Sequence, residues 1–189
     1  MKVEWLAAGA GALLGLTWIL SCASVPSDGR IGIDAPSSSD DQFHTVSDFL
    51  DHRCGSLDCH GTVGRNFRVW GCEGMRLEAK DIPGCSRGTG GSPTTADERE
   101  ATYRSLVGLE PAVMSEVVDH HGDPAQLTFI RKQRGAEAHK GGKLVIPGDL
   151  QDRCVTSWLG GNTDVSACLA ATDTMTGFPM FPALDASTE

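Results

Sequence analysis

The sequence is short of basic charge: 16 Lys and Arg residues stand against 25 Asp and Glu residues, which gives a formal net charge of -9. This balance argues against a nucleic-acid-binding protein, which needs a broad basic face for phosphates. The sequence also lacks a P-loop, a dinucleotide-binding glycine fingerprint and an EF-hand loop. No motif for nucleotide or calcium binding is therefore present. An apolar share of 40% argues against wholesale disorder.

A long hydrophobic run is found at the N-terminus. Residues 5–20 carry no charge and follow Lys2, a pattern typical of a signal-peptide core. A membrane span needs about 20 apolar residues, so this run is short for one. We therefore predict that the first segment directs export.

The end of this run, Ile19-Leu20-Ser21-Cys22, resembles the lipobox of bacterial lipoproteins. The resemblance implies that residues 1–21 are a lipoprotein signal peptide and that the thiol of Cys22 carries the lipid that anchors the protein to a membrane. Ala23, in place of Asp, implies an outer-membrane lipoprotein that faces the periplasm or the cell surface. The alternatives are an ordinary secretory signal cut nearby and an uncleaved anchor.

The rest of the chain divides by composition into a tether, one domain and a tail. Residues 22–41 are rich in Ser, Asp, Pro and Gly and predict a flexible tether. Residues 42–172 predict a single, mainly α, small disulfide-stapled domain with long loops, and residues 173–189 predict a flexible tail. Helices are expected over about 41–53, 96–107, 111–121, 127–134, 150–159 and 164–171.

The seven cysteines suit an oxidising compartment better than a reducing cytosol. If Cys22 is acylated, an even number of thiols remains, as full pairing requires. Pairing by proximity in the sequence is one of about fifteen possible connectivities. It gives Cys54–Cys59, Cys72–Cys85 and Cys154–Cys168.

The pair Cys54 and Cys59 differs from the others because His60-Gly61 follows it directly. A c-type haem needs two thiols for thioether bonds and an adjacent histidine for its iron, most often as C-x-x-C-H. The wider gap here resembles the C-x4-C-H sites of some multihaem cytochromes. This resemblance implies one haem c held by Cys54 and Cys59, with His60 as the proximal ligand.

The surrounding sequence extends the resemblance over about residues 43–161. An apolar helical pattern feeds into the motif, as the N-terminal helix does in class I cytochromes c. Three later stretches are patchily similar to planctomycete-type cytochrome c domains: Gly74–Leu77, His139–Gly142 with Pro147–Asp149, and Trp158–Gly160. The motif itself is also similar to that of a group of small myxobacterial lipoproteins. The resemblance implies a cytochrome c-like helical domain.

A second axial ligand, commonly Met or His, would complete such a site. We rank His139 first, because it sits in a Gly-flanked loop that can approach iron without helix constraint. Met180, in a Phe-Pro-Met-Phe-Pro context, is the alternative distal ligand, and Met75 and Met114 are further candidates. For each of these residues taken alone, an ordinary surface or core role is the stronger interpretation.

Two functions follow from these features. The first is a membrane-anchored, monohaem c-type cytochrome-like electron carrier with a redox protein partner and no catalytic residues of its own. The alternative is a haem-free, disulfide-stapled lipoprotein with a binding or structural role, in which Cys54–Cys59 is a disulfide and His60 is a surface residue.

Other patterns are weaker. A tetrahedral zinc site is conceivable, but cysteine zinc sites are uncommon where disulfides form. Its ligands would be His52, Cys54, Cys59 and His60. Gly84–Gly88 matches G-x-S-x-G without the flanking strand and helix that a nucleophile elbow needs. A basic cluster predicts either a solvated face or a docking patch for haem propionates or an acidic partner. It comprises Arg131, Lys132, Arg134, Lys140 and Lys143.

Overall fold

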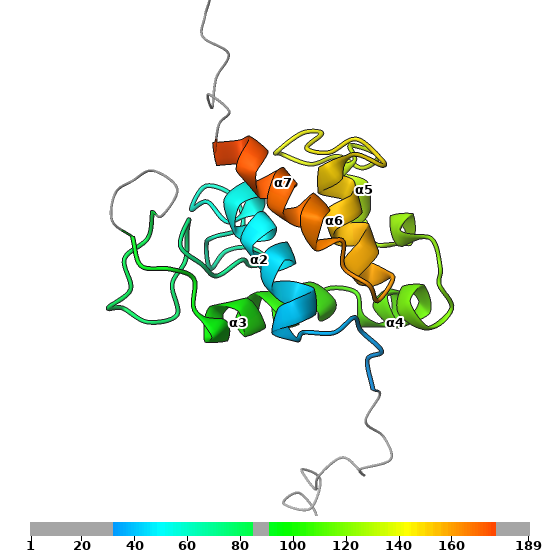
Figure 1. Ribbon diagram of the computed structural model, residues 1–189, viewed down its shortest axis with the longest axis horizontal. Coiled ribbons are helices and arrows are strands. Elements are labelled where there is room, and N and C mark those ends of the chain that lie inside the picture. Colours follow the sequence, from blue (N-terminus) through cyan, green and yellow to red (C-terminus); the bar gives the residue numbers. More distant parts are fainter. Residues whose placement is uncertain (1–31, 85–90, 177–189) are drawn as a thin grey trace, which may run out of the picture. The chain divides into compact units, whose positions relative to one another are not determined.

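The computed structural model describes residues 32–84 and 91–176, and within them it is helical without strands (Figure 1). This confirms the predicted mainly α, disulfide-stapled class. The elements are α2 (Asp40–Cys54), α3 (Ala96–Val107), α4 (Pro111–Asp119), the 3-10 turn η3 (Pro124–Gln126), α5 (Thr128–Gln133), α6 (Leu150–Leu159) and α7 (Val165–Thr176). The predicted signal peptide, Cys22, Cys85, Met180 and the end of the tail lie outside the described residues.

Helix α2 forms the centre of the domain and packs against α3, α6 and α7. Phe43, Val46, Phe49 and Leu50 recur at helical spacing along one face, and all four are buried. The ring of Phe43 lies 5.0 Å from the ring of Trp158 in α6, which is also buried. The predicted apolar stripe thus forms the core of the molecule.

Helix α3 begins with the predicted capping box. The hydroxyl of Thr95 accepts a bond from the Glu98 backbone N–H at 3.2 Å, and the Glu98 carboxylate accepts one from the Thr95 N–H at 2.9 Å. The same carboxylate forms a two-bond ion pair with Arg76, at 2.8 Å for each bond. One buried acid therefore caps the helix and fixes the long loop before it.

The disulfide Cys154–Cys168 joins α6 to α7, as pairing by sequence proximity predicts. Both cysteines are buried in the core. Cys72 is also disulfide-bonded. Its predicted partner, Cys85, is not among the described residues. Helix α7 extends to Thr176, beyond the predicted end near residue 171, because the sequence has no glycine or proline before Gly177.

The segment before α2 is fastened to the helices by three hydrogen bonds. The Tyr103 hydroxyl donates to the carbonyl of Pro36 at 2.8 Å, and the Trp158 indole N–H donates to the carbonyl of Ser37 at 3.0 Å. The backbone N–H of Asp34 donates to the Ser115 hydroxyl at 3.0 Å. The final residues of the predicted tether region therefore contact the domain itself.

None of the helices in the described part of the chain has the length and apolar character needed to cross a membrane.

Candidate functional site

The Cys54–Gly61 motif folds as a tight turn at the end of α2. The backbone N–H of His60 donates to the carbonyl of Cys54 at 2.9 Å, which brings the two ends of the motif together. The N–H groups of Cys59 and Gly61 both donate to the carbonyl of Ser56, at 2.9 and 3.0 Å. The four-residue gap is thus taken up by a hydrogen-bonded turn, and the thiol-bearing residues and His60 lie on one compact unit.

Glycine at position 61 is required by close packing. A Cβ at Gly61 would lie 1.8 Å from the carbonyl oxygen of Gly55, and a Cβ at Gly74 would lie 1.9 Å from the same atom. Three backbone segments therefore meet without side chains between them. Gly61 is therefore needed for packing within the chain itself, independently of any bound group.

Cys54 and Cys59 are both free thiols. Cys54 is half-buried, and burial raises the pKa of its thiol to about 12, against a small opposing effect of the Arg53 guanidinium. Cys59 is exposed. The disulfide that the haem-free alternative assigns to this pair is not formed in the structure.

His60 is held by the segment that follows the motif. Its Nδ1 lies 2.9 Å from the carbonyl oxygen of Phe67, and its ring lies 4.8 Å from the Phe67 ring. A carbonyl can only accept, so Nδ1 carries the proton and Nε2 presents its lone pair. Burial lowers the pKa of His60, the bond to Phe67 opposes the shift, and the nearby His139 adds to it. His60 therefore favours the neutral form, which is the form that binds metals.

The structure brings His139 to His60 from a distant part of the chain. The two ring centroids are 6.0 Å apart, and the ring planes differ by 22°. Nδ1 of His139 lies 3.4 Å from the carbonyl oxygen of Gly142, a long version of the contact that His60 makes. Within the described residues, neither Nε2 atom has a hydrogen-bond partner.

The loop that carries His139 is fixed at both ends. The N–H groups of Leu144 and Val145 donate to the carbonyl of Gln133, at 2.8 and 3.0 Å. Arg134 forms a two-bond ion pair with Asp152, at 2.7 and 2.9 Å. Arg53, beside Cys54, donates from Nη2 to the carbonyl of Leu144 at 3.0 Å. Arg53 is a residue that the sequence did not single out, since nothing in a helix pattern marks a bond to a loop so far along the chain.

The predicted basic cluster divides into two groups. Arg131 and Lys132 both pair with Glu137, and Arg134 pairs with Asp152. These three residues stabilise the loop. Lys140 and Lys143 are exposed and have no ion-pair partner among the described residues. Only these two lysines remain for a docking patch on this part of the surface.

The other ligand candidates are placed elsewhere. Met114 is fully buried in the core, where it packs with apolar side chains. Met75 is half-buried, and its backbone bonds to Gly71. His52 lies 3.8 Å from the Glu73 carboxylate. No group of three or more His, Cys, Asp or Glu side chains able to hold a metal ion occurs in the described part of the chain, so the zinc interpretation finds no support there.

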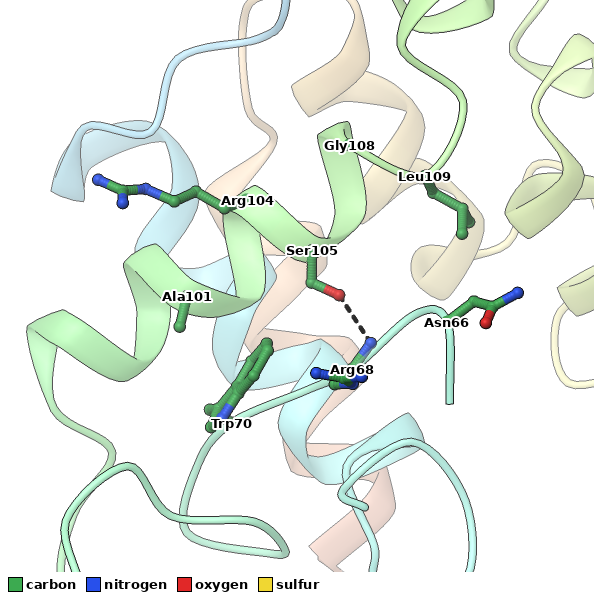
Figure 2. A pocket seen from close by; sticks show the side chains of 8 residues that line it. All are labelled: Asn66, Arg68, Trp70, Ala101, Arg104, Ser105, Gly108 and Leu109. Atoms are coloured by element: carbon green, nitrogen blue, oxygen red, sulfur yellow. Dashed lines mark hydrogen bonds between the residues drawn. The ribbon is translucent and has the colours of Figure 1, made fainter. Parts of the chain in front are cut away.

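A groove of about 690 Å³ lies along the outer face of α3 (Figure 2). It does not include the thiols or histidines of the motif. Its lining residues are Asn66, Arg68, Trp70, Ala101, Arg104, Ser105, Gly108 and Leu109.

The chain matches no family model, no curated protein and no solved structure. The chemical role of its residues is therefore inferred from the geometry of the site alone. Two imidazoles without a third protein ligand are too few for the usual bare metal ion, which takes three or four. They suffice for an iron whose other four positions are filled by a porphyrin, and two free thiols beside them suit its covalent attachment.

Proposed function

We propose that the protein is a c-type haem electron carrier, anchored to a membrane through Cys22. The observation that carries this proposal is the pairing of His60 with His139, 6.0 Å apart, beside two free thiols. Bound haem c would supply the reversible one-electron change of its iron, and the chain would hold, orient and shield it.

The spacing of the two rings fits a shared metal ion. A metal–imidazole bond is about 2 Å long, and the centre of a five-membered ring lies about 1 Å from its atoms, given ring bonds of about 1.3–1.4 Å. Two imidazoles that share one metal ion therefore have ring centres no more than about 6 Å apart, and the 6.0 Å between the rings of His60 and His139 lies within that reach.

The tautomers fit as well. Metal-binding histidines commonly direct their other ring nitrogen to a backbone carbonyl, which fixes the ring and raises its basicity. His60 does so through Phe67 at 2.9 Å, and His139 approaches Gly142 at 3.4 Å. Two imidazole ligands give a lower potential than an imidazole paired with a methionine. We expect a low-potential carrier.

Exposed apolar side chains lie near the motif in the sequence and in the His139 loop. Leu57 is 60% exposed and Val63 is 71% exposed, and they stand on either side of Cys59 and His60 in the chain. Ile146, in the loop after His139, is 62% exposed. A flat apolar macrocycle bound between the motif and the loop would cover surface of this kind.

The test uses the full chain expressed with a cytochrome c maturation system. We expect a pyridine haemochrome spectrum of the c type and a haem-staining band after denaturation. Cys59→Ala should lose covalent attachment. His139→Ala should keep covalent haem but change from a six-coordinate, low-spin spectrum to a high-spin one.

His44→Ala is the matched control, because the His44 side chain on α2 is 44% exposed and pairs, among the described residues, only with Asp48. It should leave both spectra unchanged. A colourless wild-type chain, made in cells that load a known C-x4-C-H cytochrome, would overturn the proposal. Haem that stays low-spin in His139→Ala would reject His139 as the distal ligand.

A further inference from the structure

The short segment 66–70 has two faces with different roles. Phe67 and Val69 point inward and are buried, while Asn66 and Arg68 are exposed and Trp70 is half-buried. These three outward residues form one wall of the groove beside α3, and the outer face of α3 forms the other (Figure 2).

The wall is held in place before any ligand arrives. The N–H of Arg68 donates to the Ser105 hydroxyl at 2.7 Å, and the N–H of Trp70 donates to the Thr102 hydroxyl at 2.9 Å. The N–H of Val69 donates to the carbonyl of His60 at 2.9 Å. Ligand sites are generally preformed in this way, so that binding does not have to order them.

The groove offers positive charge and an aromatic surface together. Arg68 and Arg104 use Nε for contacts to the Arg65 carbonyl and to Glu100, at 3.0 and 2.7 Å. Their terminal guanidinium nitrogens have no hydrogen-bond partner in the described residues. None of the lining residues is acidic, although the whole chain has a net charge of -9.

Trp70 adds a second signal. Its indole is half-buried and lines the groove, where it offers an aromatic surface, and its N–H is accessible to solvent. In Figure 2 the indole and the Arg68 side chain lie below the helix, with Arg104 toward one end and Asn66 and Leu109 toward the other.

We propose that this groove binds a small organic anion that carries a planar ring, of the aromatic carboxylate class. The ring would lie against Trp70, and the carboxylate would bind the free terminal guanidinium nitrogens of Arg68, which lies beside Trp70 in Figure 2. The volume of about 690 Å³ is within the usual range for such ligands. The proposal does not depend on the haem proposal, because none of the residues that line the groove is a proposed haem ligand or haem-attaching thiol.

The test is a titration of the full chain with 2-naphthoate, followed by calorimetry and by backbone amide NMR. We expect saturable binding with shifts confined to residues 66–70 and 101–109. Arg68→Gln and Trp70→Leu should each weaken binding about tenfold, the loss of one charge-assisted bond or one ring contact. Arg153→Gln, an exposed arginine on α6 away from the groove, should bind as the wild type does.

Two related probes define the ligand class. Neutral 2-naphthalenemethanol and cyclohexanecarboxylate should each bind at least about tenfold more weakly than 2-naphthoate, because each lacks one of the two features. Equal binding of either probe would overturn the stated class. No saturable binding, or binding unaffected by both variants, would overturn the site. Tighter binding of an acidic peptide would make the groove a peptide site instead. Haem content is measured separately, so its absence does not bear on these outcomes.

Discussion

The side chain of Arg53 donates to the carbonyl oxygen of Leu144 across 3.0 Å, and this bond joins the two halves of the candidate site. Arg53 directly precedes Cys54 at the end of α2, and Leu144 lies in the loop that carries His139. The Nε atom of Arg53 is buried without a hydrogen-bond partner in the described structure. The residue therefore has a spare donor beside the motif as well as a positioning contact.

Arg53→Gln should loosen the His139 loop. The shorter amide cannot make the same charge-assisted bond, which is worth about 1.5–3 kcal/mol. Hydrogen–deuterium exchange should speed up over residues 139–146 and stay unchanged in α6. Arg153→Gln is the control, since the exposed Arg153 side chain pairs with Asp164 and not with the His139 loop. Equal protection of the loop in Arg53→Gln and wild type would show that the loop is held by its other bonds alone.

Of the acidic residues, Glu98 should cause the largest loss of folding stability when it is replaced by a neutral residue. It is fully buried, and it serves both Arg76 and the N-terminus of α3. Glu98→Gln leaves a buried arginine without its counter-charge, which costs about 3–5 kcal/mol. Thr95→Ala removes only the cap and should cost about 1 kcal/mol. Chemical denaturation measures the free energy of unfolding of both variants. If Thr95→Ala lost as much of this free energy as Glu98→Gln, the dual role of Glu98 would be contradicted.

Two buried acids should respond to pH in opposite directions. Burial opposes the charge of Glu98, but bonds from Arg76, Thr95 and Leu77 hold its pKa below the usual value. Its stabilisation is therefore present at neutral pH and is lost as pH falls through the lowered pKa. Burial raises the pKa of Asp51, against bonds from Thr94 and Glu73. Its stabilisation is present at low pH and is lost as pH rises through the raised pKa.

Asp51→Asn isolates the second effect. The variant should gain thermal stability relative to wild type as pH rises from about 4 to about 8, because the charged form is the one that burial penalises. Melting temperatures of the two proteins across this range give the difference directly. Asp48→Asn is the control, because Asp48 lies on the same helix and its side chain is 40% exposed. A difference in melting temperature between Asp51→Asn and wild type that does not vary with pH would contradict the raised pKa of Asp51.

Gly61→Ala should destabilise the fold even without haem. The added Cβ would meet the Gly55 carbonyl at 1.8 Å, so backbone must move, at a cost of about 2–3 kcal/mol. Gly64→Ala is a matched control in the same loop, because nothing lies within 4 Å of its Cβ position. Thermal unfolding of the two variants should separate them clearly. Equal melting temperatures would mean that the turn relaxes freely.

Much of the helical framework could be predicted from the sequence. The apolar spacing of Phe43, Val46 and Leu50 identified α2, and the Thr95–Glu98 capping box identified the start of α3. Both signals are local, and the structure confirms them. The pairing Cys154–Cys168 also followed from proximity along the chain.

The relationships between loops could not be predicted in this way. His139 was ranked as a distal ligand from a resemblance and a Gly-flanked loop, and its ligation of haem stays a prediction. That its ring lies 6.0 Å from His60 depends on the contacts of Arg53, Gln133 and Asp152. The groove beside Trp70 likewise depends on how segment 66–70 meets α3. Such contacts between distant segments carry no periodic signal.

The bonds from Tyr103 and Trp158 to the segment before α2 have a mechanical consequence. Tension applied to the chain from its N-terminal side reaches the carbonyls of Pro36 and Ser37 before it reaches the first turn of the helix. Trp158 is buried against Phe43, so the pull is passed to the centre of the domain. A protein tethered through Cys22 would thus resist being peeled open from its anchored end.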